Sequence, residues 1–171
     1  MPDTFIKIAS VTVGSGGAAN ITFSSIPSTY TDLLIKVSAR STGSYKRGVL
    51  LCYFNGTATN LTYRRLYGIA AFGSPGSDSG SDSTTSYFSG NTSTASTFGN
   101  DEIYIPNYAS SNFKSYGSDG VSEDNSNEAG ASLTANLWSS TSAITSITLM
   151  DNQSNNLAQY STATLYGIKN S

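Results

Sequence analysis

Titratable side chains are scarce in this chain. It has no histidine, one cysteine (Cys52) and a charged fraction of 12%, whereas soluble domains typically reach about 25%. The lack of histidine excludes a serine–histidine triad and zinc or iron sites built from histidine and cysteine. Polarity is carried instead by Ser, Thr, Asn and Tyr, which hydrogen-bond well but titrate poorly. We therefore expect a protein that binds or covers a partner, not an enzyme, and we expect no cofactor.

Charges of the two signs nearly balance, and long apolar runs are missing. Lys and Arg total 9, Asp and Glu total 11, and the net charge is −2. A nucleic-acid partner would require a basic stripe, which the sequence lacks. No apolar stretch approaches the roughly 18 residues of a membrane span, and the first residues lack the features of a secretory signal. We expect no nucleic-acid or membrane partner and synthesis in the cytoplasm.

Cys52 has no partner for an internal disulfide. It lies in the apolar run Val49–Phe54, where a free cysteine usually behaves as a small hydrophobic residue. A reactive thiol needs a setting that lowers its pKa, and no neighbour in the sequence supplies one. We predict a buried, inert side chain.

The apolar pattern has a period of two along most of the chain, which is typical of half-buried β-strands. Leu33–Arg40 and Leu133–Trp138 show the alternation most clearly. No window carries a helical stripe with its start and stop signals. The predicted strands are Phe5–Val13, Asn20–Phe23, Leu33–Arg40, Gly48–Phe54, Thr62–Tyr67, Thr85–Phe88, Glu102–Ile105, Lys114–Gly117, Leu133–Trp138, Ser146–Leu149 and Thr162–Tyr166.

Turn signals separate these strands. Gly14–Gly17 (GSGG) predicts a hairpin between the first two strands, and Asn55-Gly56 predicts a tight turn. Residues 73–83 are of low complexity, and residues 119–127 are polar, so both are predicted as long loops. Such loops on a rigid β scaffold often carry function.

Many short strands, glycine-rich turns and no helices predict an all-β protein. The number of strands favours a jelly roll over an immunoglobulin sandwich, whose Cys–Trp–Cys spacing is also missing. We predict a single-domain, jelly-roll-like β-sandwich over residues 1–171. Leu66-Tyr-Gly-Ile69 recurs as Leu165-Tyr-Gly-Ile168, but so short a match is weak support for a duplication.

Carboxylates give no clear site. Asp101 and Glu102 are adjacent, and adjacent residues of a strand point to opposite faces, so they do not form the converging pair of a glycosidase. Calcium ligands are the other interpretation, but the acids do not follow the spacing of a twelve-residue calcium loop. Solvated loop acids remain the preferred interpretation, and we single out no catalytic, cofactor-binding or metal-ligating residue. The acidic and amide residues considered for calcium are Asp78, Asp82, Asp119, Glu123, Asp124 and Asn125.

Tyrosine is abundant, with 11 residues beside 7 Phe and one Trp. Tyrosine combines a large apolar ring with a polar tip and is enriched at interfaces. For those at strand ends or in loops, two interpretations stay open: half-buried rim residues, or contacts to a partner or a sugar ring; they are Tyr30, Tyr45, Tyr108 and Tyr116. Tyr63, Tyr67 and Tyr166 are predicted in the core or on a sheet face, and Trp138 is predicted to close one end of the core.

A series of segments carries a family resemblance. They are Ile26–Leu33 (IPSTYTDL), Tyr53–Gly56 (YFNG), Tyr63–Gly68 (YRRLYG), Ile103–Ser110 (IYIPNYAS), Leu137-Trp138, Ala143–Ile147 (AITSI) and Ala163–Ile168 (ATLYGI). In this order the series resembles small structural proteins of tailed bacteriophages, over roughly residues 5–168. The resemblance implies a β-rich module displayed on the virion. It brings no catalytic residues and leaves the position on the particle open.

From the resemblance we expect a virion component, most simply a capsid decoration or cement protein on the outer surface of the phage head. Its partners would be the major capsid protein or other virion proteins, and it would form a homotrimer. The alternative is a tail-fibre or receptor-binding tip, in which the loops at residues 73–83 and 119–127 would present Tyr and Asn to a host glycan. A polysaccharide-degrading enzyme is disfavoured by the missing histidine and the unpaired carboxylates.

Overall fold

The structure, a computed structural model, describes residues 4–70 and 75–169. The named elements in this part of the chain are all β-strands. They are β1 (Phe5–Thr12), β2 (Asn20–Phe23), β3 (Asp32–Ala39), β4 (Arg47–Phe54), β5 (Leu61–Ile69), β6 (Pro75–Gly80), β7 (Thr84–Ser89), β8 (Gly99–Ile105), β9 (Lys114–Ser122), β10 (Gly130–Trp138), β11 (Ile147–Asp151) and β12 (Thr162–Ile168).

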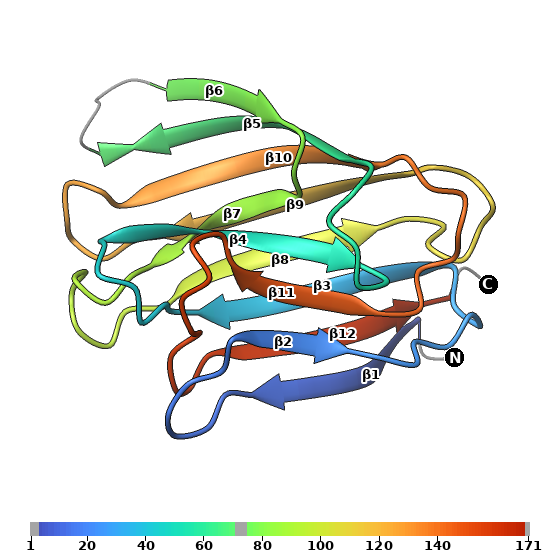
Figure 1. The fold of residues 1–171 in the computed structure, drawn as a ribbon, viewed down its shortest axis with the longest axis horizontal. Helices are drawn as coiled ribbons and strands as arrows, with labels where there is room; N and C mark the ends of the chain where they lie inside the picture. Colours follow the sequence, from blue (N-terminus) through green and yellow to red (C-terminus); the bar gives the residue numbers. More distant parts are fainter. Residues whose placement is uncertain (1–3, 71–74, 170–171) are drawn as a thin grey trace.

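The strands form two antiparallel sheets that pack face to face (Figure 1). The large sheet has eight strands in the order β1-β12-β3-β8-β9-β10-β5-β6, and the small sheet has four in the order β2-β11-β4-β7. The predicted all-β sandwich is thus confirmed. In Figure 1 the small sheet lies in front, β5 and β6 extend past its β7 edge, and the two termini lie close together.

The apolar core lies between the small sheet and the β1, β12, β3 and β8 part of the large sheet. Inward residues such as Ile35, Ile103 and Leu165 are fully buried there. The predicted end plug is confirmed, because the buried Trp138 ring lies 5.4 Å from the Phe54 ring, centroid to centroid. Cys52 is also buried as predicted, and burial raises the pKa of its thiol.

Strand β7 is held close to the large sheet by small polar side chains. The hydroxyls of Ser118 on β9 and Thr134 on β10 both donate to the Thr85 carbonyl, at 3.1 and 2.6 Å. Gly120 leaves room for the strand, since a Cβ there would meet the Ser86 Oγ at 2.5 Å. The inner side of β9 and β10 is therefore polar because it binds the backbone of an edge strand.

The predicted loop at residues 73–83 is corrected by strand β6. Residues 73 and 74 lie outside the described part of the chain, but Pro75–Gly80 pairs with β5 in antiparallel register. Gly76 and Gly80 face the rings of Tyr67 and Tyr63 closely, and a Cβ on either glycine would meet the ring at 2.6 and 2.8 Å. The low-complexity sequence forms a strand because its glycines accept two tyrosine rings from the neighbouring strand.

An ion pair fixes the register between those two glycines. The Arg65 guanidinium donates to both carboxylate oxygens of Asp78, at 3.1 and 2.5 Å. It also lies over the Tyr87 ring at 4.5 Å. This bidentate, partly buried geometry is the favourable form of an Arg–Asp pair. It joins β6 to the edge of the small sheet through β5.

The second predicted loop and the first predicted hairpin also need correction. Residues 119–122 of the expected loop at 119–127 continue β9, so the loop begins at residue 123 instead of 119. The Gly14–Gly17 turn does not form a hairpin, because β1 pairs with β12 and β2 pairs with β11. The chain instead crosses from one sheet to the other there. The Asn55-Gly56 turn is confirmed, with φ values of 52° and 69°.

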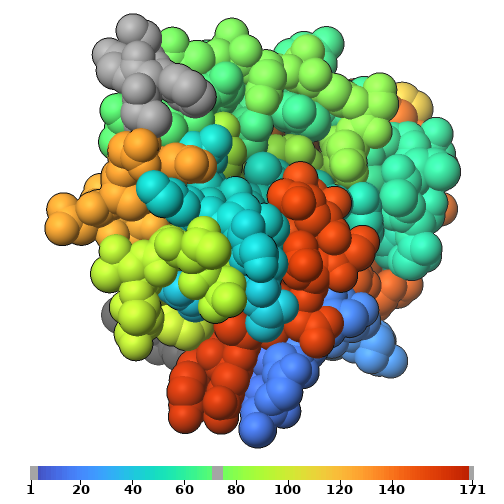
Figure 2. Space-filling model, turned by 60° about the vertical axis from the view of Figure 1, so that its left-hand side comes forward, coloured from blue at the N-terminus to red at the C-terminus, as the bar shows by residue number. Residues whose placement is uncertain are grey.

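Loops at one end of the sandwich gather around a buried arginine. Figure 2 shows this end, where the yellow-green segment between β7 and β8 lies beside the cyan connection between β3 and β4. Arg40 donates to the carbonyls of Asn91, Ser93, Thr94 and Thr97, at 2.8–3.3 Å. One buried cation thus orders the whole segment between β7 and β8.

Candidate functional site

Large exposed apolar side chains gather on the outer face of the large sheet. Among the described residues, five of the seven most exposed ones lie on its strands; they are Phe5, Leu66, Tyr104, Val121 and Leu133. Leu66 is 63% exposed and Leu133 is 59% exposed. Single exposed apolar residues are ordinary, but neighbours on one sheet face form a patch.

The strand register places these residues side by side. Leu66 on β5 lies opposite Leu133 on β10, and Leu133 lies opposite Asp119 on β9. One row away, Ala131 lies opposite Val121. We call the outward residues at the centre of this region the apolar patch; it consists of Leu66, Val121, Ala131, Leu133 and Ala135.

The patch exists because β10 turns its apolar side outward. Leu133, Ala135 and Leu137 point away from the core, while Thr134, Asn136 and Trp138 point into it. Thr134 bonds the β7 backbone and Trp138 fills the end of the core, so these inward side chains fix the direction of the strand. Because successive side chains of a strand point to opposite faces, the residues between them point outward.

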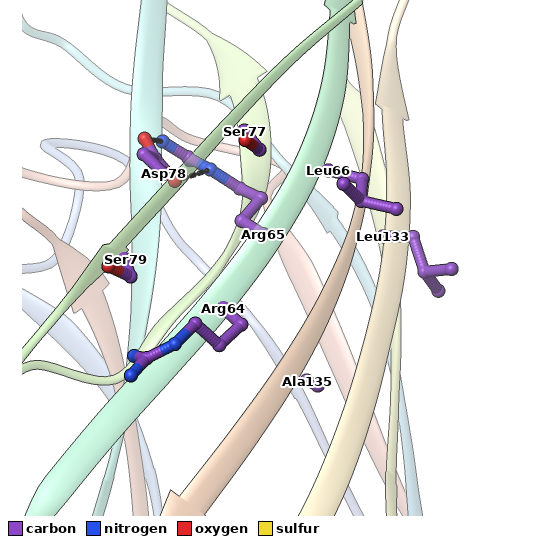
Figure 3. A pocket seen from close by; sticks show the side chains of 8 residues that line it. All are labelled: Arg64, Arg65, Leu66, Ser77, Asp78, Ser79, Leu133 and Ala135. Carbon is purple, nitrogen blue, oxygen red and sulfur yellow. Dashed lines mark hydrogen bonds and ion pairs between the residues drawn. The ribbon is translucent and has the colours of Figure 1, made fainter.

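A hollow lies beside the patch, and two glycines near it leave the backbone open. The hollow of about 510 Å³ lies along β5, β6 and β10, where apolar and polar side chains line it together, and Figure 3 shows both of its leucines pointing away from the Arg65–Asp78 pair. The lining residues are Arg64, Arg65, Leu66, Ser77, Asp78, Ser79, Leu133 and Ala135. A Cβ at Gly68 would have nothing within 4 Å, and one at Gly117 would meet only the Thr134 carbonyl oxygen at 4.0 Å. A partner can therefore approach the backbone closely at these two glycines.

Charged groups of opposite sign flank the patch. Arg64 is an exposed residue of β5, and its guanidinium bonds the Tyr63 carbonyl at 2.8 Å. Asp119 is exposed on β9, on the other side of Leu133. Neither residue forms an ion pair within the described part of the chain. Farther along the face, Glu102 pairs with Lys36.

Asp101 and Glu102 point to opposite faces, as predicted. Glu102 lies outside, whereas Asp101 is 4% exposed and lies in the polar interior near β7. Neither carboxyl oxygen of Asp101 makes a hydrogen bond of good geometry among the described residues. Burial raises the pKa of Asp101 to about 7, and the nearby hydroxyls of Thr85 and Ser86 only partly oppose that rise.

Two of the four loop tyrosines are core residues, so the rim and partner interpretations are both wrong for them. Tyr108 and Tyr116 are buried, with the Tyr108 hydroxyl bonded to the Pro27 carbonyl and the Tyr116 hydroxyl bonded to Ser83. Tyr30 and Tyr45 are half-buried. Tyr45 donates to the Asp151 carboxylate, which ties it into the loops.

The acids considered for calcium are dispersed over the fold. Asp78 pairs with Arg65, Asp82 accepts the Tyr53 hydroxyl at 3.0 Å, and Asp119 lies on the outer face. Glu123 and Asp124 accept backbone N–H groups of their own turn. Within the described residues, no three Asp, Glu, Cys or His side chains come together as a metal site.

Comparison of the chain with protein-family models, with curated proteins and with solved structures gives no match. The expectation of a phage virion protein, drawn from the segments quoted from the sequence, stays a prediction. Within residues 4–70 and 75–169, the structure has no helix that is long and apolar enough to cross a membrane.

Proposed function

We propose that the chain is a structural protein of a bacteriophage virion, a capsid decoration protein on the outer surface of the head. The observation that carries the proposal is the outward direction of the apolar side of β10. Monomeric soluble proteins rarely leave a large contiguous apolar surface uncovered, so the apolar patch is a contact surface. The resemblance over residues 5–168 supplies the kind of assembly in which such a contact is made.

The internal use of charge supports a rigid coat module. Lys114 is buried at the far end from Arg40, and its ammonium donates to the carbonyls of Ser110, Ser140 and Ser142, at 2.6–3.3 Å. Desolvation lowers the pKa values of Arg40 and Lys114. These cations order loops at both ends of the sandwich, which gives a scaffold suited to holding a fixed surface.

The finer features of the proposal are a jelly-roll-like connectivity, a homotrimer and contact with the major capsid protein. The alternative is a tail-fibre tip that binds a host glycan. The fibre-tip hypothesis requires long loops at residues 73–83 and 119–127, and β6 and the end of β9 occupy much of those two segments. The decoration protein is therefore the function we argue for, and the fibre tip becomes an outcome of its test.

Copy number in purified particles tests the proposal. A decoration protein is expected in hundreds of copies per particle, measured by quantitative gel analysis against the major capsid protein. A few tens of copies, together with binding of the purified protein to host cells, would support the fibre tip instead. Absence from particles would refute both.

Rebinding to stripped particles tests the surface. Leu133→Asp places a charge in the apolar patch and is expected to abolish binding, because a buried, unpaired carboxylate is costly. Thr29→Asp adds the same charge at an exposed residue of the connection between β2 and β3. This control is expected to bind like the unmodified protein, and equal binding by both variants would remove the patch from the contact.

A further inference from the structure

We propose that Asp101 is a pH-sensitive latch beneath strand β7, which stays closed over the protonated side chain and opens locally when the carboxyl ionises. The latch lies in the interior of the sandwich, so it does not rest on the proposed function. Three features support it: the strand that covers the carboxyl, the hydrogen bonds of the hydroxyls beside it, and the charges around it.

Strand β7 covers the Asp101 carboxyl. Asp101 lies opposite Gly120 in the ladder between β8 and β9, and a Cβ on Gly120 would meet the Ser86 Oγ of β7 at 2.5 Å. All six residues of β7 are buried, and Asp101 beneath them is 4% exposed. Water therefore reaches the carboxyl only when part of this cover moves.

Of the strands around Asp101, β7 is the one most easily lifted. It is an edge of the small sheet, whereas β3, β8 and β9 are each paired on both sides. Its ladder with β4 is interrupted between Val49 and Leu51. Towards the large sheet, the backbone of β7 meets the hydroxyls of Ser118 and Thr134. Segments with few apolar contacts and weak pairing open at the lowest free energy.

The Thr85 hydroxyl couples the charge of Asp101 to the attachment of β7. Thr85 and Ser86 are the neighbours whose hydroxyls favour the ionised form of Asp101, but both donate elsewhere. Thr85 donates to the Leu50 carbonyl at 3.1 Å, across the interruption in the ladder. Ser86 donates to the Tyr87 carbonyl at 3.4 Å. A carboxylate accepts stronger hydrogen bonds than a carbonyl, so ionisation draws Thr85 away from Leu50 and loosens β7 where its ladder is already broken.

The surroundings of Asp101 do not neutralise its charge. Its titratable neighbours are Asp119 on β9, which has the same sign, and the Cys52 thiol on β4, which stays neutral because burial raises its pKa. On β3 the apolar Val37 lies opposite Asp101, and β10 contributes uncharged inward side chains such as Thr134. Asp101 forms no ion pair among the described residues. Burial therefore raises its pKa to about 7, and the latch responds around neutral pH.

Amide hydrogen exchange of the full chain, followed by NMR from pH 5 to 8, tests the latch. Each exchange rate is divided by the rate of an unstructured amide at the same pH, which leaves the opening equilibrium constant. For the amides of β7 this constant should rise about fiftyfold between pH 5 and 7 and less than about twofold from pH 7 to 8, because the closed form holds its proton up to about pH 7 and the open form loses it near the ordinary pKa of 3.8. Amides of β3 should stay at least about tenfold more protected throughout.

Two variants assign the response to Asp101. Asp101→Asn keeps the shape but cannot ionise, so its opening constant for β7 should not change with pH. Glu102→Gln is the matched control on the exposed face and should keep the full rise. A rise that survives in Asp101→Asn would overturn the inference. In the unmodified protein, β7 amides that open no more readily than those of β3, or an opening constant independent of pH, would overturn it without any variant.

Discussion

Replacement of the buried Asp101 by asparagine should stabilise the protein at neutral and alkaline pH. Asparagine has nearly the same shape but stays neutral, so the packing against β7 is preserved. The pKa of Asp101 rises from 3.8 to about 7 in the folded protein, which means that the folded state binds the proton more tightly than the unfolded state. The stabilisation that protonated Asp101 gives the folded protein is fully present below about pH 4 and is lost as the pH rises towards 7.

The size of the effect follows from the shift. About three pKa units at 1.36 kcal/mol each correspond to roughly 4 kcal/mol, a large fraction of the 5–15 kcal/mol by which domains are typically stable. Asp101→Asn is therefore expected to match the unmodified protein near pH 4 and to exceed its free energy of unfolding by up to about 4 kcal/mol near pH 8.

Urea unfolding of both proteins across this pH range measures the difference. Subtracting the free energy of unfolding of the unmodified protein from that of the variant removes the effect of the other carboxylates, because they titrate in both proteins. Glu102→Gln is the matched control, because Glu102 is the next residue and lies on the exposed face; its difference should vary little from pH 6 to 8. A difference for Asp101→Asn that does not change with pH, or that is destabilising throughout, would refute the reasoning.

Three further predictions concern the loops and the edge strand. Arg40→Ala leaves the carbonyls of residues 91–97 without their donor, so amide hydrogen exchange there should accelerate at least tenfold; unchanged exchange would contradict the role of Arg40. Lys114→Met removes three hydrogen bonds to carbonyls and should cost about 2–4 kcal/mol in chemical unfolding, so a loss below about 0.5 kcal/mol would contradict it. Gly76→Ala pushes a Cβ into the Tyr67 ring and should cost about 1–3 kcal/mol, whereas Gly68→Ala meets nothing; equal costs would show that the ring does not lie on Gly76.

Alternation in the sequence predicted most of the strands but could not tell which side of each strand is buried. Eleven of the twelve strands overlap predicted ones, and their ends differ by at most five residues, the largest difference being at the end of β9. Leu66 and Leu165 begin the same tetrapeptide, yet Leu66 is exposed and Leu165 is buried. The direction is set by tertiary contacts, such as those of Thr134 with β7, and these are not visible in a local pattern.

The missed features have the same origin. Strand β6 has no apolar alternation, because tyrosine rings of β5 cover its glycines. Tyr108 and Tyr116 were expected near the surface from their position at strand ends, but their hydroxyls find partners in the interior. The apolar patch was missed because the apolar side of β10 was not identified as the exposed one. The sequence did carry a signal for it: Trp138 shares one face of β10 with the polar residues Thr134 and Asn136, opposite the apolar face.

Thiol labelling in the assembled particle tests the contact surface most directly. Cys52 is fully buried and its burial raises the thiol pKa, so it should not react, and a cysteine introduced elsewhere reports its own position alone. In the free, dilute protein, the thiols of the Leu133→Cys and Thr29→Cys variants should both be labelled quickly. In purified particles, the account predicts strong protection at residue 133 and continued labelling at residue 29. Equal labelling of the two positions in particles would contradict the claim that the protein assembles through the apolar patch.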